Sequence, residues 1–266
     1  MSAVVGLFTN DSPGVFQRSV ISGVAEIVEA AGHTVKITEL RSQVTASQEV
    51  ARLTAGTLGS LVITNVLGDE ALAEVVTSGH PVTLVSHRAS GLSVPTVMHD
   101  NRQGMRQLVE HLVADDRHEF VYVGGRGDQL DGRERERFFR EELMRHAIDV
   151  PPQRFLAGDF EPATAANSLL ELVQRDRGFD AVVAADYLMA IAAMDALRRA
   201  GVDVPGEVSV VGFGDGPEAG LAGLTVVSAD VVELGRRAAR QLLAQVEGER
   251  LRGYTVIRAR LIVRAS

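Results

Sequence analysis

One segment of the chain, Val208-Ser-Val-Val-Gly-Phe213, restricts the possible folds more than any other. It is β-branched and apolar without polar alternation, a pattern typical of a strand buried on both faces of a parallel sheet. Its carboxyl end continues into Gly214-Asp-Gly-Pro217, which is too flexible and too polar to extend the strand. Because open α/β sheets bind ligands just beyond the carboxyl ends of their strands, this loop is the first place to expect a binding site.

The same unit of strand and helix recurs along the chain. Apolar extended segments alternate with helical patterns of the length that forms βαβ units and parallel sheets. About ten strands are many for one sheet, so we predict an α/β protein with two doubly wound parallel-sheet lobes. The predicted strands lie at 4–8, 34–40, 60–64, 81–86, 96–98, 120–123, 154–157, 181–184 and 208–213, with a final extended segment at 254–263.

Composition excludes several classes of protein. The formal net charge of -8 argues against a general surface for nucleic acid or acidic membrane. The absence of cysteine excludes disulfides and thiolate sites. No apolar run reaches the roughly 20 residues needed to cross a bilayer, and the start runs directly into a strand without a signal peptide. The sequence therefore predicts a cytoplasmic protein without membrane contact, although a secreted protein with its signal removed would have the same features.

Motifs for catalysis are weak throughout. Gly124-Gly-Arg-Gly127 lacks the Lys-Ser/Thr of a phosphate loop and the spacing of a dinucleotide fingerprint. The seven histidines form no HxxxH or HExxH pair, and Ser86-His87 has no nucleophile elbow around it. We therefore expect no catalytic residue, no metal and no cofactor. The Arg/Glu run from Arg133 to Glu142 reads as a solvated helix face with i,i+4 pairs, except that Arg135 is close enough to a strand-end loop to reach a binding site.

The order of several short motifs resembles the effector-binding core of the lactose-repressor (LacI/GalR) family of bacterial transcription regulators. The resemblance covers the chain from about Val4 to Arg264, and each motif alone is weak. The motifs are Asp100-Asn-Arg-Gln-Gly104, Glu110-His-Leu112, Phe120-Val-Tyr-Val-Gly-Gly125, Arg133-Glu-Arg135 with Phe139, Gly158-Asp-Phe160, Ala184-Ala-Asp-Tyr-Leu-Met-Ala190, Val204-Pro to Gly212-Phe213, Leu224-Thr225, Glu233-Leu-Gly235 and Leu261-Ile-Val-Arg264.

This resemblance implies the type I periplasmic-binding-protein fold, with the chain crossing between lobes near residues 99, 229 and 253. The N-terminal lobe would contain residues 1–99 and 230–253, and the C-terminal lobe residues 100–229 and 254–266. A small-molecule effector would bind in the cleft between them, with Arg135 as the arginine that holds hydroxyl or carboxylate groups and Phe160 as a stacking aromatic. The predicted ligand-binding residues are Asp11, Phe16, Ser86, Asp100, Arg135, Phe160, Asp186, Gly214 and Asp215.

The sequence departs from the family pattern where that family usually binds sugar hydroxyls. Ala185-Asp186-Tyr187 stands where the family has Ala-Asn-Asp, and Gly214 replaces the first Asp of Gly-Phe-Asp-Asp. Ser86 and Ala229 replace a usual Asp and Gln. An unmatched hydroxyl loses roughly 1–3 kcal/mol if its partner stays buried. A standard hexose or pentose is therefore not the expected effector; a bulkier, less hydroxylated or partly cationic ligand fits these residues better.

The leading hypothesis is the effector-sensing and dimerisation core of a LacI-type transcription regulator, acting as a homodimer. Family members carry a helix-turn-helix before the first strand, whereas this sequence begins at that strand. Operator DNA would accordingly be a partner only through a head that these residues do not include. A solute-binding protein of a transporter or receptor is the alternative with the same fold. An enzyme is the third reading, for which no nucleophile–base pair or metal site is found.

Overall fold

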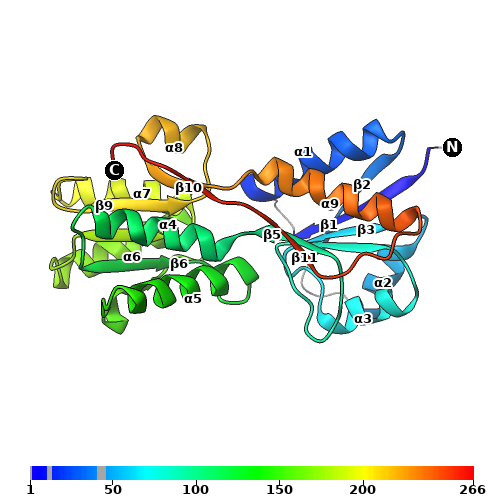
Figure 1. Cartoon of the computed structure of the whole chain (residues 1–266), viewed down its shortest axis with the longest axis horizontal. Coiled ribbons are helices and arrows are strands. Elements are labelled where there is room, and N and C mark those ends of the chain that lie inside the picture. The colour runs from blue at the N-terminus through cyan, green and yellow to red at the C-terminus, as the bar shows by residue number, and fades with distance from the viewer. Residues whose placement is uncertain (1, 11–13, 41–45) are drawn as a thin grey trace. The chain divides into compact units, whose positions relative to one another are not determined.

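The computed structural model describes residues 2–10, 14–40 and 46–266, and it divides the chain into two compact units. The first unit contains Met1–His99 and Asp230–Ile257, and the second contains Asp100–Ala229 and Arg258–Ser266. Within the described residues, each unit holds one six-stranded sheet with helices on both faces (Figure 1). The predicted α/β class with two doubly wound sheets is therefore confirmed. None of the described helices is both long and apolar enough to cross a bilayer.

The first unit is built on a parallel sheet in the order β11-β5-β4-β3-β1-β2. Its strands are β1 (Val4–Asn10), β2 (Thr34–Leu40), β3 (Ser60–Ile63), β4 (Val82–Val85), β5 (Thr96–His99) and β11 (Tyr254–Ile257). Helices α1 (Val15–Ala30) and α9 (Val231–Val246) cover one face, and α2 (Ala46–Thr54) and α3 (Asp69–Thr77) cover the other.

Two separate apolar clusters, one on each face, explain why the strands of this sheet lack polar alternation. Val5 and Leu7 of β1 pack toward the cluster that contains α1 and α9. Phe8, the next residue, packs on the opposite side with Leu53 of α2 and Leu72 of α3. Successive side chains of a strand point to opposite faces, so a sheet covered on both sides needs apolar residues at every position.

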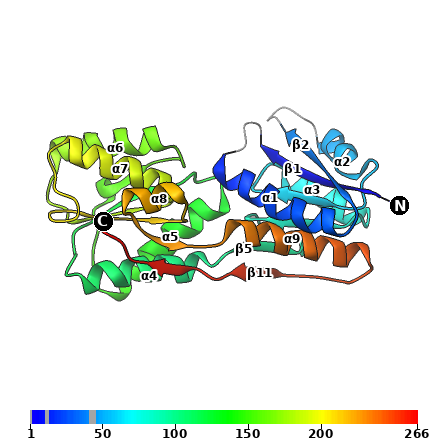
Figure 2. The ribbon, with the colours of Figure 1, turned by 90° about the horizontal axis from the view of Figure 1, so that it is seen from above.

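The second unit has the strand order β12-β10-β9-β8-β6-β7, which is parallel except for β12. Helices α4 (Asn101–Ala114) and α5 (Leu130–Arg145) lie on one face, and α6 (Pro162–Arg175) and α7 (Tyr187–Arg199) lie on the other (Figure 2). The strands are β6 (Phe120–Gly124), β7 (Phe155–Ala157), β8 (Ala181–Ala184), β9 (Ser209–Phe213), β10 (Thr225–Ser228) and β12 (Arg260–Ile262).

The predicted strand at 208–213 is confirmed as β9, which is buried along its length between β8 and β10. Strand β10 and the short helix α8 (Pro217–Ala222) were not predicted, because each is too short to show a period. The segment predicted as extended at 254–263 is extended, but it forms two strands rather than one. It forms β11, which pairs with β5 in the first unit, and β12, which pairs with β10 in the second. The last crossing therefore follows Ile257 rather than residue 253.

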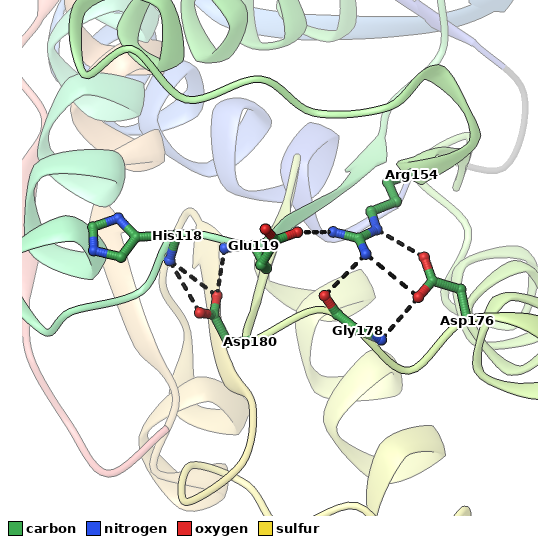
Figure 3. A network of polar contacts seen from close by, with 6 residues as sticks. All are labelled: His118, Glu119, Arg154, Asp176, Gly178 and Asp180. Atoms are coloured by element: carbon green, nitrogen blue, oxygen red, sulfur yellow. Dashed lines mark hydrogen bonds and ion pairs between the residues drawn. The ribbon is translucent and has the colours of Figure 1, made fainter.

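A polar network closes the amino edge of the second sheet (Figure 3). Arg154 donates to Glu119 through Nη1, to Asp176 Oδ2 through Nε at 2.8 Å, and to the carbonyl oxygen of Gly178 through Nη2 at 2.9 Å. Nearby, Asp180 accepts the backbone N–H groups of residues 118 and 119. These contacts join the segments that precede β6, β7 and β8, so the network fixes the entry of three strands.

Acid is expected to weaken this network through Asp176. The hydrogen bond from Arg154, helped by the backbone N–H of Gly178, holds the pKa of Asp176 below its ordinary value of 3.8. A depressed pKa in the folded state contributes stability above the unfolded-state value, and that contribution disappears as the pH falls through the folded-state pKa. Asp176→Asn should therefore lower the free energy of unfolding by about 1 kcal/mol near neutral pH.

Urea unfolding of both proteins between about pH 6 and pH 2.5 tests this expectation, because the window spans the ordinary carboxyl pKa. The difference between wild type and Asp176→Asn should shrink steadily below the ordinary pKa of 3.8. A difference that stays constant across the series would show that the ionised carboxylate contributes nothing.

Candidate functional site

The order of strands in each sheet marks where a ligand is expected to bind. In the second sheet the chain runs from β6 outward to β7 and then returns to β8 on the other side of β6. The connections after β6 and β8 therefore leave the sheet in opposite directions, and open α/β sheets bind ligands in the space between two such connections. In the first sheet the corresponding point lies between β1 and β3.

Arg135 extends from α5 to this point of the second sheet. Its Nε donates to Asn101 Oδ1 at 3.0 Å, and its Nη1 donates to the carbonyl oxygen of Ala185, just after β8, at 2.7 Å. Its Nη2 lies 3.5 Å from Asp131 Oδ2. The guanidinium carbon lies 3.9 Å from the centroid of the Phe213 ring. Only 6% of Arg135 is exposed, so most of its donors are already used inside the protein.

The sequence did not predict the acidic partners around Arg135. Asn101 Nδ2 donates to Asp131 Oδ1 at 2.8 Å and to Glu134 Oε2 at 3.0 Å, and both carboxylates are buried. Asn101 therefore joins the first turn of α4 to α5 and orients Arg135 through its other atom. The only indication of this role in the sequence was the position of Asn101 next to Asp100, in a motif that resembles the LacI/GalR family.

The Arg/Glu run of α5 is solvated only in part. Arg140 and Glu136 form the expected exposed pair at 2.8 Å, but Glu134 faces inward, so the prediction of a wholly solvated face was wrong there. Glu134 precedes the buried Phe138 by four residues, which places both side chains on the same face of the helix. Packing of the aromatic residues thus orients Glu134 toward the interior.

Phe160 stands beside the loop that follows β6. Its ring lies against the backbone of Gly125: a Cβ on that glycine would be 2.2 Å from Phe160 Cζ. The ring centroid is 6.0 Å from the Arg135 guanidinium carbon. Asp159 and Phe160 both have left-handed backbone conformations, with φ values of 55° and 59°. The structure thus brings Phe160 and Arg135 near each other, and the stacking of Phe160 on a ligand stays a prediction.

Asp186 follows β8 and begins α7. Its Oδ1 accepts the backbone N–H of Met189 at 2.7 Å, so the side chain caps the helix. Burial raises the pKa of the Asp186 carboxyl, against the Met189 N–H and the Arg135 charge, which lower it. Asp186 and Arg135 are thus close enough to interact electrostatically at the same strand-end point.

Gly214 and Asp215, which follow β9, differ in what they offer to a ligand. Gly214 has a φ of 91°, and a Cβ there would lie 3.2 Å from Tyr187 Cδ1, so glycine suits both the backbone and the adjoining ring. Asp215 is bound by Arg264, whose Nη2 lies 3.0 Å from both carboxylate oxygens. The Asp215 carboxylate therefore anchors the C-terminal segment, and its predicted ligand role competes with this ion pair.

Three further predicted residues are Asp11, Phe16 and Asp100. Asp11 lies outside the described residues. Phe16, in the first turn of α1, packs edge-on against the His99 ring with centroids 6.1 Å apart. Asp100 caps α4 by accepting the Gln103 N–H at 3.0 Å. A helix cap is a sufficient structural role for Asp100, and its contact with a ligand stays a prediction.

Ser86 is the least expected feature of the first unit. It follows β4 with a φ of 50°, is 1% exposed, and its Oγ has no hydrogen-bond partner among the described residues. An unpaired buried hydroxyl costs roughly 1–3 kcal/mol. Thr64, which sequence reasoning missed, follows the neighbouring strand β3 with a φ of 56° and is also buried. Both side chains therefore sit at the carboxyl edge of the first sheet.

Backbone strain gathers at these strand ends. A left-handed conformation costs roughly 1–3 kcal/mol in a non-glycine residue and is characteristically retained at functional sites. Within the described residues, two of the six non-glycine residues with positive φ follow helices, where such a conformation is common. The other four follow strands of the two sheets and are Thr64, Ser86, Asp159 and Phe160. Across 2–10, 14–40 and 46–266, no group of three or more His, Asp or Glu side chains could hold a metal ion.

The chain is similar to known regulators in sequence. The family described as periplasmic binding protein-like domain matches residues 109–266. The HTH-type transcriptional regulator CelR of Thermobifida fusca is 31% identical over 201 residues, which make up 74% of this chain and 58% of CelR. The chain thus spans little more than half the length of this curated relative.

Solved structures agree with this similarity. A complex of the transcriptional regulator CelR with cellobiose matches 99% of this chain and 84% of its own, with a TM-score of 0.87 and 26% identity. The lac repressor dimer bound to operator and the anti-inducer ONPF matches 100% of this chain and 94% of its own, with a TM-score of 0.89 and 18% identity, which supports the fold. The chain therefore belongs to the periplasmic binding protein-like family and corresponds to the effector-binding region of LacI/GalR-type transcriptional regulators.

Proposed function

We propose that this region senses a polar small molecule and dimerises as part of a bacterial transcription regulator. The observation that carries the proposal is that strained, polar or aromatic residues follow β3 and β4 in the first sheet and β7 in the second, at the carboxyl edge of each sheet. Open α/β sheets bind ligands at that edge. Ser86, whose buried hydroxyl has no partner in the part of the chain that the structure describes, supplies a group that a bound ligand would satisfy.

Regulation would follow from a shift in population. A ligand that contacts the carboxyl edges of both sheets would bind best when the two edges face each other across it. It would stabilise that arrangement by the difference between its binding free energies for the two arrangements. DNA-binding segments attached to two such chains would then change their spacing. The operator-bound dimer named for the lac repressor supports a homodimer acting on DNA. The regulator names of the relatives favour a non-enzymatic role over a solute receptor or an enzyme.

A sugar-like ligand is the first class to test, because a CelR relative is seen with cellobiose. Thermal unfolding in the presence of cellobiose, other neutral sugars, polyols and nucleosides should reveal at least one ligand that raises Tm. Arg135, Phe160 and Ser86 are the residues expected to touch it. No shift with any compound in this panel would count against the proposed sensing role.

Ser86→Ala separates ligand binding from folding. The substitution removes a buried hydroxyl that has no partner among the described residues, so the free protein should be as stable as wild type or slightly more stable. Affinity for a ligand found in the panel should fall about tenfold, equivalent to about 1.4 kcal/mol. Titration calorimetry measures this loss directly.

Ser209→Ala provides the matched control. Ser209 is also a buried serine, but it lies at the amino end of β9, whereas Ser86 follows the carboxyl end of β4. It should leave the dissociation constant unchanged. Equal affinities for wild type and Ser86→Ala would remove Ser86 from the site.

A further inference from the structure

Carboxylates outnumber guanidinium groups at the carboxyl edge of the second sheet. Each arginine there already has a partner: Arg126 lies 2.7 Å from Asp128, Arg264 is bound to Asp215, and Arg133 donates to the carbonyl oxygen of residue 127. Arg135 is enclosed by Asn101, Asp131 and the Ala185 carbonyl. The charged residues of the strand-end loops and the first turns after them are Arg126, Asp128, Asp131, Arg133, Glu134, Arg135, Asp159, Glu161, Asp186, Asp215 and Glu218, joined by Arg264.

Four carboxylates at this edge form no ion pair within the described residues: Asp159, Glu161, Asp186 and Glu218. Asp159 and Glu161 line an open hollow with Arg126 and Asp128, on either side of the Phe160 backbone. Because Arg126 is already neutralised by Asp128, a ligand that approaches Phe160 meets a net negative surface. An anionic ligand such as a sugar phosphate would be repelled there.

Asp186 is the best placed of the four carboxylates. It lies at the point where the connections after β6 and β8 diverge, next to the Ala185 carbonyl that holds Arg135. Capping of α7 by itself does not call for an ionised side chain, because asparagine caps a helix about as well as aspartate. The other side-chain caps in the described residues include Asp100 and Asp230, whose cap hydrogen bonds are exposed, whereas that of Asp186 is partly buried.

The partly buried Asp186 carboxylate therefore carries a desolvation cost that the cap and the Arg135 charge offset only in part. A positively charged ligand group beside Asp186 would offset that cost, since an opposite charge favours the ionised form. The ring of Phe160 would add a favourable interaction, because aromatic faces attract cations. We propose that the effector of this protein carries a positively charged amine that pairs with Asp186 while an apolar face of the ligand stacks on Phe160. This inference rests on the proposed sensing function and specifies the ligand class for the same site.

A matched pair of disaccharides tests the inference. Cellobiose and its 2,2′-diamino counterpart, β-1,4-linked diglucosamine, share one skeleton and differ only in two hydroxyl groups replaced by amines. Titration calorimetry at about pH 6, where such amines are protonated, should show the diamine binding about tenfold tighter to the wild-type chain. A sugar phosphate such as glucose 6-phosphate should not bind.

Asp186→Asn is the decisive variant because asparagine keeps the helix cap and removes the charge. The affinity ratio between diamine and cellobiose should fall to about one, with Tm unchanged or raised. Asp195→Asn is the matched control: it removes one charge from the exposed face of the same helix, where Asp195 pairs with Arg199. That variant should keep the tenfold preference.

The outcomes separate the two proposals. Equal binding of both disaccharides, or a preference that survives Asp186→Asn, would overturn the amine inference and leave the sensing function standing. A Tm shift with a neutral ligand and none with any amine analogue would have the same meaning. Absence of any response to neutral and amine-bearing ligands alike would contradict both.

Discussion

Replacing Arg135 by alanine is expected to lower the free energy of unfolding by about 3–5 kcal/mol, since one partner of a buried ion pair is removed. The substitution leaves the Asp131 carboxylate, Asn101 Oδ1 and the Ala185 carbonyl without the donor that now satisfies them. It also removes the guanidinium that lies against the Phe213 ring. Chemical denaturation monitored by circular dichroism measures the loss.

Arg199→Ala is the appropriate control for Arg135→Ala. Arg199 forms an exposed ion pair with Asp195 on α7, and such pairs contribute less than about 1 kcal/mol. A loss for Arg135→Ala no larger than that of the control would contradict the structural role of Arg135. Ligand affinity should then be compared only in variants whose folding has been verified.

The close crossing of α1 and α9 predicts the second large effect. A Cβ on Gly235 of α9 would lie 2.2 Å from the carbonyl oxygen of Val20, and one on Gly23 of α1 would lie 2.0 Å from the carbonyl oxygen of Val232. Both obstacles are backbone atoms, which cannot move aside like a flexible side chain. Gly235→Ala should therefore force the helices apart and destabilise the protein by about 3 kcal/mol, the upper part of the range for overpacking.

A glycine-to-alanine substitution at a position where the added Cβ meets no neighbouring atom supplies the comparison. Gly220 lies on the exposed side of α8, and a Cβ there would meet nothing within 4 Å. Gly220→Ala should raise stability slightly, because alanine is a better helix former than glycine by roughly 0.5–1 kcal/mol. Thermal unfolding of both variants checks the pair, and equal Tm values for wild type and Gly235→Ala would contradict the packing argument.

Most strands were predictable because burial on both faces leaves a direct mark on the sequence. After an initial buried serine, β9 and β3 are continuous apolar runs, and the clusters on either side of the first sheet require that pattern in β3. The segment at 254–263 was not predictable in this way. Tyr254 and Val256 are largely exposed, and only backbone pairing with β5 and β10 shows that the segment forms two strands in two units.

The site was predictable in its residue types more than in its contacts. Arg135 and Phe160 were named from a family resemblance, and the structure places them near each other. The resemblance carried no information on how Arg135 is held, since Asn101 lies 34 residues before it and Ala185 lies 50 residues after it. For the same reason the predicted ligand role of Asp215 did not anticipate its ion pair with Arg264, 49 residues away.

By itself, the sequence determined the alternation of strands and helices, the two-sheet class and the polar character of the strand-end loops. These are local properties, because the period of apolar residues and the placement of glycine act over a few positions. The tertiary structure alone decided which charged side chains form ion pairs with one another. It pairs Arg135 and Arg264 inside the second unit and leaves Asp186 without an ion pair among the described residues. Pairing of this kind depends on distances between groups far apart in the chain, which only the packed fold establishes.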